Sequence, residues 1–153
     1  MRRRKSRQSQ AQEKLLYAAM RAEDEAVACV HELDPAVALA TACSVEQILA
    51  IDWEAEQEEI RRRGDPRRVM CISRIRVREL DAALASLPHG VHPDPAAECH
   101  LLQIVKDLPP DRAWWVAHLV VRYAQFRMSQ LSADRKSDQN TDMDDSRHAA
   151  ARL

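Results

Sequence analysis

Arginine is the residue type in this sequence with the clearest chemical potential. Between Arg61 and Arg78 there are eight arginines and one acidic residue, Asp65. Guanidinium groups stay charged and can bind phosphate oxygens through two parallel hydrogen bonds. The five acidic residues from Asp52 to Glu59 could pair with them instead, so nucleic-acid contact and an acid-paired surface both stay open. The candidate phosphate-binding residues are Arg61, Arg62, Arg63, Arg67, Arg68, Arg74, Arg76 and Arg78.

A second basic cluster lies at the start of the sequence. Residues 1–7 carry five positive charges and no negative one, although the formal net charge of the chain is only −1. Because residues 1–9 are polar and basic, we expect them to form a disordered arm. Such an arm would add affinity for phosphate without reading base sequence. Its candidate contacts are Arg2, Arg3 and Arg4.

Sequence motifs of metal sites and enzymes are missing. Three histidines and a cysteine fall close together, but their spacing matches no common zinc finger, and the last two are adjacent on an expected helix; they are His89, His92, Cys99 and His100. There is no glycine-rich phosphate loop, no G-x-S-x-G and no H-E-x-x-H. We therefore predict a protein that is not an enzyme and has neither a metal nor a cofactor.

The composition favours a single all-α domain. The chain has only two glycines and 4% aromatic residues, but 46% hydrophobic residues, so a core of Ala, Leu, Val and Ile must form from helices. We expect about five to six helices between residues 10 and 131. Asp34-Pro35 and Asp94-Pro95 should each start a helix, with Asp as the N-cap and Pro in the first turn. The polar residues 132–153 should form a disordered tail.

Two short helices separated by Cys43-Ser44 have the length of a helix-turn-helix. Ser44 followed by Gln47 resembles a capping box, which would start the second helix. Glu46, Gln47 and Asp52 would then lie on its polar outer face. Acidic residues in that position repel phosphates, so an ordinary helical hairpin is the alternative interpretation.

The segment from Val69 to Val77 fits two structures. Its alternating β-branched residues favour a short strand near 69–75 that leads into a helix from about Arg78 to Leu87. Read with helical spacing, one face of a helix instead carries Val69, Ile72, Leu80, Ala83 and Leu87.

The last expected helix, from Pro110 to about Leu131, holds most of the aromatic residues. Its apolar side is wider than a chain of this size needs for its core, so we expect part of it to form a homodimer or partner contact. The candidate interface residues on this helix are Trp115, Leu119, Tyr123 and Phe126.

Three stretches resemble a known family, the D subunit of the bacterial flagellar master regulator and its relatives on mobile elements. They are Leu15–Ala18 followed by Asp24–Ala28, then Ser44–Ala50, and Val69–Ile75. The resemblance implies a helical homodimer that acts with a second, zinc-binding regulator subunit to recruit RNA polymerase to a promoter. It also implies that Cys71 lies on the dimer strand and that the second subunit makes much of the DNA contact.

Two functions follow as hypotheses. The first is a dimeric transcriptional regulator that contacts DNA, a partner regulator subunit, or both. The second is a helical adaptor, scaffold subunit or mobile-element inhibitor that acts by protein–protein binding alone. No apolar run is long enough to span a membrane, and no apolar segment follows the basic start, so we expect a cytoplasmic protein without membrane contact.

Overall fold

The computed structural model describes residues 6–64 and 74–150, and these ranges contain five helices and no strand. The all-α class predicted from composition is confirmed. The helices are α1 (Arg7–His31), α2 (Pro35–Arg62), α3 (Arg74–Ala85), α4 (Pro95–Val105) and α5 (Pro110–Ala150).

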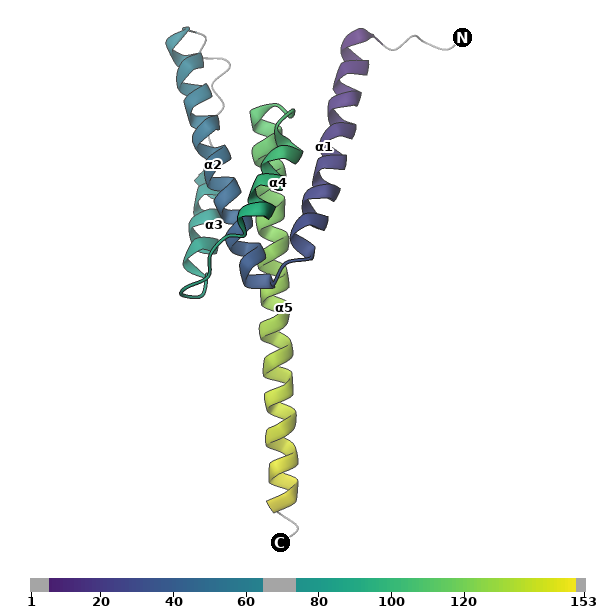
Figure 1. The fold of residues 1–153 in the computed structure, drawn as a ribbon, viewed down its shortest axis with the longest axis vertical. Coiled ribbons are helices and arrows are strands. Elements are labelled where there is room, and N and C mark those ends of the chain that lie inside the picture. Colours follow the sequence, from purple (N-terminus) through teal and green to yellow (C-terminus); the bar gives the residue numbers. More distant parts are fainter. Residues whose placement is uncertain (1–5, 65–73, 151–153) are drawn as a thin grey trace, which may run out of the picture.

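Helix α5 runs through the middle of the molecule (Figure 1). Its first half packs most extensively against α2 and also against α1, while α4 packs on α1 and α2, and α3 packs on α2 and α5. Helices α1 and α2 diverge toward the N-terminal end of α1, and the second half of α5 extends away from the other helices (Figure 1). The N-terminal part of α1 and the second half of α5 therefore project from the packed body (Figure 1).

The helix starts follow the capping chemistry expected from the sequence. Asp34 caps α2 by accepting a hydrogen bond from the Ala36 backbone N–H at 3.2 Å, and Asp94 caps α4 through the Ala97 N–H at 2.9 Å. Both predicted Asp-Pro starts are confirmed. Helix α1 begins earlier than the predicted Gln10, because the Ser6 side chain accepts from the Ser9 N–H at 3.2 Å.

The predicted break at Cys43-Ser44 is wrong. Helix α2 continues through both residues, so the structure has no helix-turn-helix there. Neither residue stops a helix: Cys43 is buried in the core, and the Ser44 hydroxyl donates a hydrogen bond to Glu98 of α4 at 2.9 Å. Ser44 thus joins two helices instead of capping one.

The predicted strand near 69–75 is described only at residues 74 and 75, and there the structure has a helix instead. Residues 65–73 lie outside the described ranges, but α3 already begins at Arg74. Leu80 and Ala83 are buried and Leu87 packs beside them, as the helical spacing predicts. Gly64, at a φ of +79°, follows the end of α2 at Arg62.

The last helix is longer than the sequence analysis predicted. We expected it to end near Leu131, yet α5 continues to Ala150. The polar composition that suggested a disordered tail does not itself break a helix, and no Gly or Pro follows Pro110 in the sequence. Every described side chain from Leu131 to Met143 is exposed, so this part of α5 has no core of its own.

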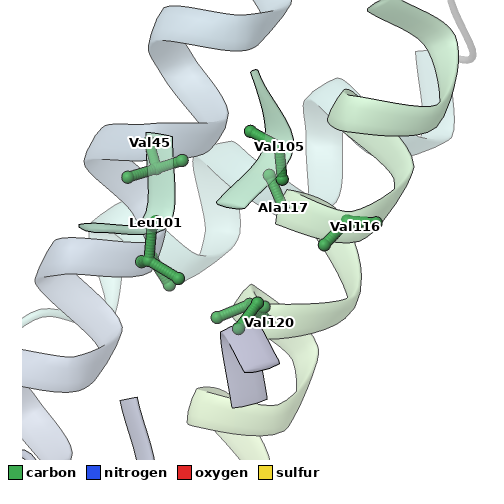
Figure 2. A pocket seen from close by; sticks show the side chains of 8 residues that line it. Val45, Leu101, Val105, Val116, Ala117 and Val120 are labelled. Atoms are coloured by element: carbon green, nitrogen blue, oxygen red, sulfur yellow. The ribbon is translucent and has the colours of Figure 1, made fainter. Parts of the chain in front are cut away.

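The core is built from small aliphatic residues, as predicted. Alanines such as Ala26, Ala42 and Ala117 are almost fully buried and let the helix backbones approach closely. A small cavity of about 10 Å³ remains where α2, α4 and α5 meet, between Val45, Leu101 and Val116 (Figure 2). All the residues around it are aliphatic, so it offers a ligand no hydrogen bond and has room for about one water at most.

Candidate functional site

The first half of α1 carries an apolar surface that the other described residues leave exposed. Its members, which we call the α1 patch, keep between 45% and 55% of their surface exposed. They are Leu15, Leu16, Tyr17 and Met20. Farther along α1, Ala22, Ala26 and Val30 are buried in the core. Figure 1 shows the reason: the N-terminal part of α1 stands away from the other helices.

The patch continues along α1 as a stripe with its own charge pattern. Leu16, Met20 and Val27 are four and seven residues apart, which places them on one side of the helix, next to the buried face. At 100° per residue, Glu23 and Asp24 lie on opposite margins of this stripe. In the part of the chain that the structure describes, neither carboxylate has an ion-pair partner.

The basic residues of α1 lie on another side of the helix. Arg7, Lys14 and Arg21 recur every seventh residue, and helical geometry places each of them at least 100° from the apolar residues of the stripe. The stripe is therefore apolar in its centre and acidic at its margins. A surface of this kind fits an apolar partner whose own margins are basic.

A second unusual feature is a polar cluster inside the body. Glu46 of α2 is fully buried, and its Oε1 accepts hydrogen bonds from Trp114 Nε1 at 3.2 Å and His118 Nδ1 at 2.9 Å. The other ring nitrogen of His118, Nε2, lies 2.7 Å from Glu79 Oε2 of α3. Glu79 is partly exposed, so the cluster runs from the core to the surface and joins α2, α5 and α3.

This arrangement is better suited to joining helices than to catalysis or metal binding. Both ring nitrogens of His118 contact carboxylate oxygens, so neither is free to contact a substrate or a metal ion. Within the described residues, Glu46 Oε2 and Trp53 Nε1 are buried without a hydrogen-bond partner. The Trp53 and Trp114 rings pack against each other with centroids 6.4 Å apart.

The sequence analysis missed this cluster and placed Glu46 on a polar outer face, which is wrong. The error followed from the false break at Cys43. When α2 is read as one helix, Leu39, Cys43, Glu46 and Trp53 fall on one side, and this spacing would have placed the glutamate in the core. No local signal points to His118 as its partner, because the two residues are 72 positions apart.

The three candidate arginines at the end of α2 pair with neighbouring acids. Arg61 and Arg62 lie 3.7 and 3.6 Å from the Glu58 carboxylate, and Arg63 lies 3.1 Å from Glu59. These pairs are well exposed, so each contributes little to stability. They nevertheless balance most of the positive charge at the end of α2, which favours the acid-paired interpretation of this part.

The remaining predicted nucleic-acid contacts are only partly visible. Arg78 is exposed on α3. Arg74 and Arg76 belong to the first turn of α3, where the structure describes the backbone alone. Outside the described residues lie Arg2, Arg3, Arg4, Arg67, Arg68 and the predicted interface residue Cys71.

The predicted interface residues of α5 do not act alike. Trp115 and Phe126 are exposed at 36% and 60%, as a contact surface requires. Leu119 and Tyr123 are only half-buried, and the Tyr123 hydroxyl hydrogen-bonds with His31 Nδ1 of α1. Tyr123 therefore serves at least partly to hold α1 on α5.

The cysteines and histidines give no sign of a reactive or metal-binding site in the described ranges. Burial, with a contribution from Glu46, raises the pKa of the Cys43 thiol to about 12, and burial together with Asp94 raises the pKa of Cys29. Both thiols thus stay protonated and are poor nucleophiles. No group of three or more potential ligands was found among the described residues, where His89, His92, Cys99 and His100 are exposed.

One described segment, Pro35–Glu59, is long and apolar enough to cross a membrane by length and composition. Half of the window that passes this test is buried inside the body. It also contains the fully buried Glu46. These properties are those of a core helix in a helical domain.

No protein-family model, curated protein or solved structure matches this chain. The resemblance to the flagellar regulator subunit therefore stays a prediction, and the functional argument rests on the residues themselves.

Proposed function

We propose that this chain is a non-enzymatic helical adaptor that binds another protein through the α1 patch. The observation that supports this most is the exposure of four large apolar side chains on a helix segment that projects from the body. Leu16 and Met20 lie on one side of the helix, with Leu15 and Tyr17 to either side of them, and exposed apolar surface of this kind marks an interaction site.

The energy available from this surface is moderate. Complete burial of one large apolar side chain stabilises by roughly 1.5–3 kcal/mol. The four side chains of the patch are each about half exposed, so covering them would contribute roughly 3–6 kcal/mol before the entropic cost of association. That range suits a specific partner whose charges add to the affinity.

Photo-crosslinking in the native host tests the proposal. A photoreactive phenylalanine replaces Tyr17 in one version of the chain and Asp138 in a control version. Both positions are exposed, but Asp138 lies on the projecting half of α5. We expect a discrete protein adduct from position 17 that disappears with Leu16→Glu and is absent from position 138. Identical adducts from both positions, or none from position 17, would contradict the proposal.

A dimeric transcriptional regulator, acting with a second regulator subunit, is the second candidate. The density of arginine between Arg61 and Arg78 supports it. Its test is a salt titration of binding to DNA, where log K should fall with log salt at a slope near −0.9 for each neutralised phosphate. Undetectable binding at low salt would remove this candidate and leave the adaptor untouched.

A further inference from the structure

We infer that the occupant of the α1 stripe is an amphipathic helix of another protein, with lysine or arginine on both sides of its apolar face. This inference rests on the proposed function and specifies its partner. It depends on three properties of α1, namely the spacing of the apolar residues, the position of the acids, and the position of the bases.

The spacing of the apolar residues favours a helical occupant. Leu16, Met20 and Val27 recur four and seven residues apart, the spacing with which one helix presents a row of side chains to another helix. The stripe covers about 16 Å along the axis, at 1.5 Å per residue. A facing helix of about three turns would cover it.

The acids at the margins specify a basic occupant. Glu23 lies on the margin toward the body and Asp24 on the outer margin, so a helix seated on the stripe would place its flanking residues beside both carboxylates. Opposite charges at such flanking positions determine which helices pair. Exposed ion pairs of this kind each change affinity by about two- to fivefold. Two such pairs should therefore favour a lysine-flanked helix over a glutamate-flanked one by roughly five- to twentyfold.

A second copy of this chain fits the stripe less well. An antiparallel pair centred on the stripe would place Glu23 against Met20 of the second copy, so each carboxylate would lie against an apolar side chain without a basic partner. A parallel pair would place Glu23 beside Glu23, and these like charges oppose pairing. Nucleic acid is disfavoured for the same reason, because phosphates would meet the acidic margins.

Binding of two synthetic helices to the full chain tests the inference. The helices share one leucine face and differ only in their flanking residues, which are lysine in one and glutamate in the other. Fluorescence anisotropy should give at least fivefold tighter binding of the lysine-flanked helix, and this preference should shrink at about 0.5 M salt. The variant E23K/D24K should reverse the preference.

A matched control separates the stripe from the overall charge of the chain. The variant K14E/R21E makes α1 more acidic on the side away from the stripe, and it should leave the preference unchanged within about twofold. If K14E/R21E raises the preference for the lysine-flanked helix by as much as E23K/D24K lowers it, the preference reflects general electrostatic attraction. That result would overturn the inference.

The other outcomes distinguish this inference from the proposed function. Equal binding of both helices, lost in L16A/M20A, overturns the basic occupant and leaves the adaptor intact. Binding that L16A/M20A does not weaken contradicts both. No binding of the lysine-flanked helix overturns the inference. A dimer in light scattering that L16A/M20A dissociates would identify a second copy as the occupant and also overturn it.

Discussion

Replacing Glu46 with alanine tests the buried cluster that joins α2, α3 and α5. The change removes the carboxylate oxygen that accepts hydrogen bonds from Trp114 at 3.2 Å and His118 at 2.9 Å. His118 is 3% exposed, so water has little access to replace the lost acceptor. Removing one member of a buried, hydrogen-bonded pair costs roughly 3–5 kcal/mol. For a chain of this length, the melting temperature should fall by roughly 6–20 °C.

The position of the cluster, from core to surface, predicts an ordered series of variants. Glu79→Ala removes the partner at the exposed end, where water can take its place, so the cost should be about 1 kcal/mol. Glu46→Gln keeps one acceptor oxygen but loses the charge, and it should fall between the two. The double variant E46L/H118L removes both buried polar groups together and should recover part of the stability lost in Glu46→Ala.

Denaturant unfolding followed by tryptophan fluorescence measures the series, and circular dichroism checks that each variant keeps its helices. The reasoning is refuted if Glu46→Ala costs less than about 1 kcal/mol, or if Glu79→Ala costs as much as Glu46→Ala. Either result would mean that the buried carboxylate does not hold the cluster together.

Three further predictions concern other parts of the molecule. Arg127 donates hydrogen bonds to the Val30 and Leu33 carbonyls at 3.0 and 3.3 Å and so caps the C-terminal end of α1. Arg127→Ala should lower the free energy of unfolding, measured with denaturant, by roughly 1–3 kcal/mol. An unchanged unfolding midpoint would exclude this capping role. Folding raises the pKa of Cys43 from 9.0 to about 12, so the contribution of this thiol to stability is complete below pH 9 and is lost as the pH rises through 12. Between pH 9 and 12, Cys43→Ala should therefore lose less stability than the unchanged chain. Identical pH profiles of stability for the two proteins would contradict this prediction. Removing residues 138–153 should lower the helix content but change the free energy of unfolding by less than about 0.5 kcal/mol, because the described side chains of that segment are exposed. A large loss of stability would contradict this prediction.

Much of the fold could be predicted because its signals are local. Asp34-Pro35 and Asp94-Pro95 start helices through contacts within one turn, and Gly64 supplies the positive φ that ends a segment. Two helix boundaries were predicted wrongly, the break at Cys43-Ser44 and the end of the last helix near Leu131. In both places a weak local preference was taken as the end of a helix. Ser44 can cap a helix, but it can also hydrogen-bond across to α4, and only the packing of α4 decides between these roles.

The candidate sites were harder to predict because they depend on what covers each helix. The sequence of α1 shows an apolar run at Leu15–Met20, and such a run can lie either in the core or on the surface. Its exposure depends on where α4 and α5 end beside it, which spacing along α1 cannot reveal. Likewise, Glu46 is compatible with burial only because His118 and Trp114 approach it from α5.

The proposed function requires that another protein covers the α1 patch in the cell. Met20→Cys, at a position 51% exposed, gives a thiol that a membrane-permeant maleimide can label, and Met143→Cys, at 67%, gives a control on α5. Peptide mass spectrometry should find position 20 labelled in the purified chain but protected in intact host cells, with position 143 labelled in both. Equal labelling of position 20 in cells and in the purified chain would contradict the account.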